Sequence, residues 1–143
     1  MPFSSPPNPK NYAAKVYELV RAIPAGRVMA YGHIAVFILP PLEMDPGQYL
    51  RLSPRWVGQA MANCPDDAPW QRVINSQGKV SPRPGYGPMM QRSLLEQEGV
   101  IFDDKERVDF EQYGWVPERA WLVEHGFVAP PPEDDEPPQP ALF

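Results

Sequence analysis

The stretch SPRWVGQAMAN, residues 53–63, decides the fold, because it predicts a helix with an unusually slim face. Its serine–proline pair supplies a cap and a first-turn proline, which together favour a helix start. Gly58, Ala60 and Ala62 thin the helix, although a glycine in a helix interior costs about 1 kcal/mol relative to alanine. Close approach of another backbone would offset that cost. The approaching backbone is either that of another helix of the protein or that of a nucleic acid contacted by Arg55. This stretch alone slightly favours the protein helix.

A second short helix is predicted just before this one, from about Gly32 to Leu39. Residues 40–52, PPLEMDPGQYLRL, read as a long connection that contains prolines. Two short helices in tandem favour a helix-turn-helix, although the usual turn has only about 3–4 residues. A longer helix with apolar residues at helical spacing is predicted from the Asn8-Pro9 pair to Pro24.

The remaining elements are short. Val73-Ile74 and Val80 are predicted to be extended pieces on either side of a turn. Helices are predicted from Pro88 to Gly99 and from Pro117 to Gly126, and a small strand around residues 108–110. The fold class predicted is therefore mainly α with small β elements.

The chain divides into one domain with two unlike ends. Residues 1–9 are rich in proline and serine and are predicted to be a disordered N-terminus. Residues 10–128 have the length and apolar content of a single domain. Residues 129–143 hold six prolines and four consecutive acids, which predicts an extended acidic tail that cannot bury a core.

Composition excludes several classes of protein. The single cysteine, Cys64, allows no internal disulfide and favours a reducing compartment. No Cys/His cluster has zinc spacing, and no apolar run approaches the roughly 20 residues of a membrane span. The N-terminus does not resemble a secretory signal. We expect a monomer without metal or membrane contact in the cytoplasm or nucleoid, or in the nucleus of a eukaryote.

The net charge of −5 conceals a division along the chain. Up to Leu95 there are ten Lys and Arg against five Asp and Glu, whereas from Glu96 onward there are three against thirteen. A basic body followed by an acidic end favours nucleic-acid contact by the body. The alternative, with about even odds on charge alone, is that the acids merely solvate a surface.

Four segments taken together resemble the C-terminal domain of the O6-alkylguanine-DNA alkyltransferases. They are IPAGRVMAYGHIA at 23–35, PRWVGQAMAN at 54–63, PWQRVINSQGKVS at 69–81 and QRSLLEQEGV at 91–100. The resemblance spans about residues 10–100 and leaves out both ends and the 42–51 connection. It implies a winged-helix-like helix-turn-helix domain that enters the minor groove of DNA, unlike most such motifs, which read the major groove.

One of these segments departs from the family at its decisive position. The alkyltransferases have Pro-Cys-His-Arg-Val where this chain has PWQRV at residues 69–73, so Trp70 stands where their cysteine accepts the alkyl group. Nucleophilic catalysis needs a thiolate and a group that activates it, so we expect no catalytic residue and no cofactor. Glu98 matches the glutamate that orients the family's histidine and is expected to have nothing to orient. The tryptophan resembles the alkyltransferase-like proteins, which bind O6-alkylguanine and sensitise it to nucleotide excision repair.

The resemblance also implies roles in DNA binding and base flipping. Arg55 would fill the gap left by an extruded nucleotide, and Tyr31 would crowd the 3′ phosphate. Gly58 and Ala60 would keep the helix slim enough for the minor groove. Asn63 would be a structural hinge. A surface salt bridge is the alternative for Arg55, and a half-buried core ring is the alternative for Tyr31.

A second set of residues is implied to line a lesion pocket. Trp70 would offer a flat wall to the purine, and Arg83 would lie over the flipped base. Val73 and Ser81 would contribute backbone contacts to the base edge. Arg83 lies in a loop rich in proline and glycine, so a solvated arginine is nearly as plausible there.

Two other functions stay open. An active alkyltransferase would need another thiol, for which Cys64 is the only candidate. A DNA-binding regulator of the minor groove without lesion preference would use the same helix pair. The acidic end is expected on the side away from DNA, as a surface for an excision-repair protein or simply as a solubilising segment.

Overall fold

The computed structural model describes residues 5–129, and its first helix begins at the predicted cap. Helix α1 spans Pro9–Ala22, and the Asn8 side chain accepts a hydrogen bond from the Asn11 N–H at 3.1 Å. Pro9, expected in the disordered N-terminus, is thus the first helical residue. Positions 1–4 of that segment, and the acidic tail from 130 onward, lie outside the described residues.

The helix pair of the predicted helix-turn-helix is present, but its second member is longer than predicted. Helix α2 spans Tyr31–Ala35, shorter than expected, and α3 spans Pro46–Ala62. The prediction that α3 begins at the pair Ser53-Pro54 is wrong, because Pro54 lies inside the helix. Arg55 therefore lies in the second half of α3 and not at its front.

Helix α3 starts at an earlier pair of capping residue and proline, Asp45-Pro46, which is of the same type as Ser53-Pro54. The Asp45 side chain accepts a hydrogen bond from the Gln48 N–H at 3.2 Å, and Pro46 occupies the first turn. The early turns then place Tyr49 in the core, where its hydroxyl donates to the Ala35 carbonyl at 2.9 Å. Much of the expected connection is therefore helical.

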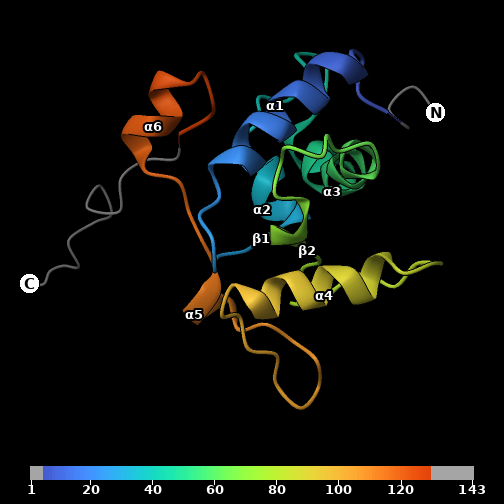
Figure 1. Ribbon diagram of the computed structural model, residues 1–143. Coiled ribbons are helices and arrows are strands. Elements are labelled where there is room, and N and C mark those ends of the chain that lie inside the picture. The colour runs from blue at the N-terminus through green and yellow to red at the C-terminus, as the bar shows by residue number, and fades with distance from the viewer. Residues whose placement is uncertain (1–4, 130–143) are drawn as a thin grey trace, which may run out of the picture.

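Two very short strands lie between the α1–α3 group and α4 (Figure 1). Strand β1, Met29–Ala30, pairs in parallel with β2, Val73–Ile74, in the register Met29 to Val73 and Ala30 to Ile74. A 3-10 turn, η1, spans Trp70–Arg72 and leads directly into β2. The prediction for β2 is confirmed, whereas Val80 belongs to no strand because the Asn75 side chain holds residues 75–79 in a turn.

The C-terminal elements are helical. Helix α4 spans Gly87–Gln97, α5 spans Phe110–Tyr113 and α6 spans Arg119–Glu124. The bounds of α4 and α6 agree with prediction to within about two residues, which is the usual uncertainty of helix ends. The strand predicted at 108–110 is wrong, because the Asp109 side chain caps the Glu111 N–H at 2.9 Å and begins a helix instead.

The buried side chains form two clusters on either side of the strand pair. The larger joins α1, α2 and α3 around Trp56, whose ring meets Tyr12 and Tyr49 edge to face at 5.5 and 5.8 Å. The smaller contains Ile74 and Leu95 and lies towards α4 and α5. The mainly α fold with small β elements is confirmed. Within residues 5–129, no helix has the length and apolar character needed to cross a membrane.

Candidate nucleic-acid interface

A small cavity brings together six of the nine residues singled out in the sequence. Its volume is about 140 Å³, and it lies between the helix pair, η1 and the loop that leads into α4. The lining residues are Tyr31, Gly58, Met61, Ala62, Trp70, Val73, Ser81, Arg83 and Gln91. Sequence reasoning missed Met61 and Gln91 as lining residues. Arg55, Ala60 and Asn63 lie outside the lining.

Trp70 forms one wall of this cavity. It is the first residue of η1 and is neither fully buried nor fully exposed. Pro69 precedes the turn, and the Val73 N–H closes it on the Trp70 carbonyl. The indole is therefore held at the cavity by a short, rigid turn and is not part of the hydrophobic interior.

Polar groups also line the cavity. The Tyr31 hydroxyl lies 3.4 Å from the Ser81 hydroxyl, which joins the start of α2 to the loop after β2. The Arg83 guanidinium donates to the Ser81 carbonyl at 3.0 Å and to the Gln91 side-chain oxygen at 3.2 Å. The cavity thus combines an aromatic wall with a hydroxyl pair and a cation.

The size of the cavity limits what can enter it. An apolar cavity of about 150 Å³ can hold benzene, so 140 Å³ accommodates a single aromatic ring. A purine has two fused rings and would need the cavity to widen.

The outer face of α3 adjoins the cavity. A Cβ added at Gly58 would meet no atom within 4 Å, so this face is open, and Arg55 is exposed one turn earlier. Arg55 forms no ion pair with any residue in the described range 5–129, so the salt-bridge interpretation finds no support there.

Ala60 does not belong to this open face. It is only 7% exposed, and its carbonyl accepts the Tyr17 hydroxyl of α1 at 2.7 Å. Ala60 is thus largely buried against α1, and its role in DNA contact stays a prediction. Asn63 ends α3 as its C-cap, and its carbonyl accepts Tyr17 at 3.2 Å, so its role as a hinge stays a prediction.

Glu98 organises the segment behind Trp70, contrary to the expectation that it has nothing to orient. Its carboxylate accepts the Gln71 side chain at 2.7 Å, the Gly26 N–H at 2.9 Å and a two-pronged pair from Arg72. Arg72 also donates to the Ile23 carbonyl at 2.7 Å. Burial alone would raise the pKa of Glu98, but the bonds from Arg72, Gly26 and Gln71 outweigh it and hold the pKa below its ordinary value.

Cys64 lies apart from the cavity. It is partly buried beyond the end of α3 and does not contribute to the lining. Burial raises the pKa of its thiol, and the nearby Arg21 cation offsets this only in part. A thiol held in its protonated form is a weak nucleophile.

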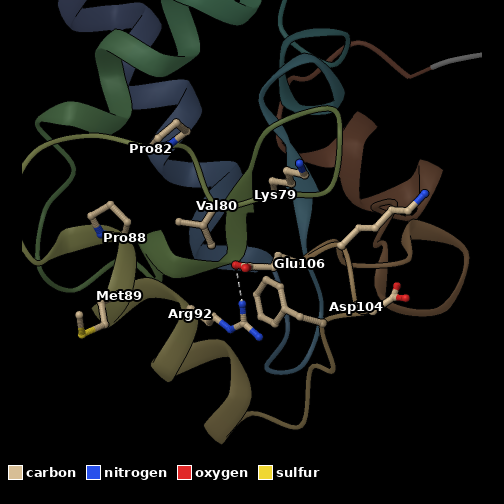
Figure 2. Close-up of a pocket in the computed structure, with 10 residues that line it drawn as sticks. Lys79, Val80, Pro82, Pro88, Met89, Arg92, Asp104 and Glu106 are labelled. Atoms are coloured by element: carbon tan, nitrogen blue, oxygen red, sulfur yellow. Dashed lines mark hydrogen bonds and ion pairs between the residues drawn. The ribbon is translucent and has the colours of Figure 1, made fainter.

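A larger cleft of about 470 Å³ lies near the cavity, against α4, and Figure 2 shows its lining. Arg92 points into this cleft, where it pairs with Glu106 at 3.0 Å and lies 4.4 Å from the centre of the Phe102 ring. The cleft contains none of the residues singled out in the sequence, so we assign the site to the smaller cavity. Within residues 5–129, no three His, Cys, Asp or Glu side chains gather to hold a metal ion.

Comparison with known proteins agrees with this geometry. The family model described as 6-O-methylguanine DNA methyltransferase, DNA binding domain, matches residues 11–100. A DNA base-flipping protein of Vibrio parahaemolyticus is 33% identical over 108 residues, which cover 74% of this chain and 97% of that protein. Alkyltransferase-like protein 1 of Schizosaccharomyces pombe is 36% identical over 113 residues, which cover 74% and 95%.

A solved structure shares the architecture as well. The crystal structure of S. pombe Atl1 in complex with damaged DNA containing O6-carboxymethylguanine superposes with a TM-score of 0.57 at 33% identity. The match covers 76% of this chain and 97% of Atl1. From the helix pair, the cavity beside it and these relatives, it follows that the chain belongs to the 6-O-methylguanine DNA methyltransferase family, through its DNA-binding domain.

Proposed function

We propose that this protein is a non-enzymatic sensor of DNA damage. It binds duplex DNA containing O6-alkylguanine through the minor groove, holds the flipped base beside Trp70 and promotes nucleotide excision repair. The observation that carries the proposal is the single cavity shared by Tyr31 and Gly58 of the helix pair and by Trp70 of the loop. A base extruded by the helix pair would meet the aromatic wall directly.

The exposed face of α3 supports the DNA-binding step. Gly58 leaves that face open, so a nucleic-acid backbone can approach closely. Arg55 is exposed on the same helix and is long enough to enter the gap left in the base stack. Extrusion costs a few kcal/mol and costs least for a damaged, poorly paired base, which is one source of selectivity.

The lining of the cavity supports recognition of the base without chemistry on it. The Trp70 indole can stack on a purine, and the Arg83 guanidinium can lie over an aromatic face, an attraction of roughly 0.5–2 kcal/mol. Trp70 stands at the position of the family's acceptor cysteine and provides no nucleophile. Cys64 does not line the cavity, so it is poorly placed to receive an alkyl group.

The acidic end of the chain supports the proposal that one surface faces the DNA and another faces a repair protein. Residues 96–124 carry nine Asp and Glu against three Lys and Arg and include α5 and α6. Phosphates would repel this region, so it would face away from the duplex and remain open to a repair protein. We propose that the protein acts as a monomer, with one cavity engaging one lesion.

A duplex titration tests the proposal. Binding to O6-methylguanine duplex and to the matched guanine duplex is measured at one fixed ionic strength, because phosphate contacts make affinity depend on salt. We expect the modified duplex to bind at least about tenfold more tightly, a difference of about 1.4 kcal/mol. Equal affinities would indicate a regulator without lesion preference.

A transfer assay addresses the remaining alternative. The protein is incubated with duplex carrying a labelled O6-methyl group, and label on the protein is measured. We expect none to accumulate, whereas stoichiometric labelling would establish an active alkyltransferase. The Cys64→Ser variant would then show whether Cys64 is the acceptor.

A further inference from the structure

We propose that Gln91 is a positioning residue that holds Arg83 at the rim of the cavity and so sets the preference for the modified base. The inference rests on the proposed function, since it concerns how the same cavity distinguishes its ligand. Nothing in the sequence motifs singles out this glutamine. Its burial and its partners do.

Gln91 is buried to an unusual degree for a long polar side chain. It is 2% exposed, and within residues 5–129 the only other buried polar side chain is Ser53. A buried amide destabilises a fold unless its hydrogen bonds are satisfied. A buried amide at this position is therefore stable only if neighbouring groups form hydrogen bonds with it.

The amide satisfies its hydrogen bonds with three partners. Its nitrogen donates to the Gln71 carbonyl at 3.2 Å and to the Val73 carbonyl at 2.8 Å, and its oxygen accepts from Arg83 at 3.2 Å. Carbonyls need a donor and a guanidinium needs an acceptor, so only one orientation of the amide fits. One side chain thereby ties the backbone beside Trp70 to Arg83.

The guanidinium of Arg83 is held by two hydrogen bonds and lies close to Gly87. Besides Gln91, the Ser81 carbonyl accepts from it at 3.0 Å, and a Cβ added at Gly87 would lie only 3.3 Å from it. Arg83 is otherwise exposed in a loop, where a long side chain samples many rotamers. Fixing the guanidinium beforehand lowers the ordering cost of binding.

The consequence is a cavity whose two recognition groups share one support. Gln91 fixes the η1–β2 backbone that carries Trp70 and also fixes Arg83 on the facing loop. Loss of the amide would leave Arg83 with only its hydrogen bond to the Ser81 carbonyl among the described residues, and so less firmly positioned. Plain duplex, which leaves its bases stacked, would not sense the change.

The isosteric variant Gln91→Met tests this inference against the matched control Gln97→Met, an exposed glutamine on the same helix. Affinities for O6-methylguanine duplex and guanine duplex are measured for each folded protein. We expect Gln91→Met to reduce the preference for the modified duplex about tenfold, with plain duplex affinity unchanged, and Gln97→Met to match the parent. Equal losses on both duplexes would show a merely structural role and overturn the inference.

A double-mutant cycle shows whether Gln91 acts through Arg83. We expect Gln91→Met to reduce the preference much less when Arg83→Ala is already present, because only the hydrogen bonds to the Gln71 and Val73 carbonyls then remain to be lost. Additive losses would overturn the inference. A parent protein without any preference would instead overturn the proposed function itself, so the two failures are distinguishable.

Gly87→Ala provides a test that leaves both partners intact and remains available if Gln91→Met does not fold. The added methyl group would lie 3.3 Å from the guanidinium, which would have to shift by a few tenths of an ångström, while every charge stays in place. We expect a folded protein whose preference for the modified duplex is reduced severalfold. A folded Gly87→Ala variant with the parent's preference would contradict the positioning role.

Discussion

Trp70 and Gln71 together determine which chemistry the cavity can support. An indole cannot accept an alkyl group as a thiolate does, and the Gln71 amide cannot act as a base. Gln71 is also engaged with Glu98 at 2.7 Å. Neither residue therefore provides the nucleophile or the activating base that alkyl transfer at this position would need.

We predict that Trp70→Cys alone does not restore alkyl transfer, because the new thiol has no base beside it. Single-turnover transfer from labelled O6-methylguanine duplex measures this. The double variant Trp70→Cys/Gln71→His places an imidazole within reach of Glu98 and should be faster than the single variant. Rapid transfer by the single variant would show that the thiol needs no activation here.

We predict that Arg55→Ala weakens binding to O6-methylguanine duplex by about tenfold or more, since the extruded state loses the group that fills its gap. Binding to guanine duplex should fall much less. Arg51→Ala removes the same charge from an exposed site one turn earlier on α3 and serves as the matched control. Equal losses of affinity from the two variants would mean that Arg55 only contacts a phosphate and does not fill the gap in the base stack.

Helix α3 shows how far local sequence signals reach. Two cap-and-proline pairs, Asp45-Pro46 and Ser53-Pro54, offer equivalent starts, and local chemistry cannot rank them. The buried Tyr49 decides in favour of the earlier pair, because its hydroxyl reaches the Ala35 carbonyl and the Tyr12 hydroxyl. That decision depends on tertiary packing, which one sequence does not display.

We predict that Asp45→Ala destabilises the fold by about 1 kcal/mol, the usual cost of a lost N-cap. Ser53→Ala should be neutral or slightly stabilising, because the Ser53 hydroxyl is buried without a well-formed hydrogen bond to any described residue. Chemical denaturation of both variants measures the difference. The reverse order of effects would mean that the helix begins at the later pair.

The Glu98 network joins the loop after α1, η1 and the end of α4, so it makes stability depend on pH. Its folded pKa lies below the ordinary value of 4.5, so its contribution is full above that value and is lost as pH falls through the folded pKa. We predict that the free energy of unfolding of Glu98→Gln falls less than the parent's when pH is lowered from 6 towards 3. Glu96→Gln, exposed on the same helix, should keep the parent's pH dependence.

The sequence predicts the residues that line the cavity better than it predicts the residues that hold them in place. Trp70, Arg83 and Tyr31 could be named because motif spacing fixes their order, and the structure brings them to one cavity. Gln91 and the partners of Glu98 could not be named, because their roles depend on carbonyls and side chains distant along the chain. The role of Ala60 could not be decided from sequence, because a small residue fits a groove and a helix contact equally well.

For the molecule as a whole, charge is separated along the chain rather than balanced. The basic body up to Leu95 contains the helix pair and the cavity, whereas the excess of acid begins at Glu96 in the last turn of α4. A charge division of this kind would orient the protein on a duplex wherever the two segments also lie on different faces.

We predict that affinity for plain duplex falls steeply with salt, by a slope of roughly 0.9 in log units for each phosphate contacted. A titration series in salt gives the slope. Arg51→Ala should lower it by about one contact, whereas Gln97→Met should leave it unchanged. A slope near zero would mean that the basic body makes no phosphate contacts.

The strand pair between the two clusters has only two residue pairs, but its register decides which side chain faces the cavity. Val73 packs with the larger cluster and lines the cavity, whereas Ile74 packs with the smaller cluster. Adjacent strand residues point to opposite sides, so a slip of one position would exchange these two side chains and turn Ile74 towards the cavity. The register of two residue pairs therefore keeps the larger Ile74 side chain out of the lining beside Trp70.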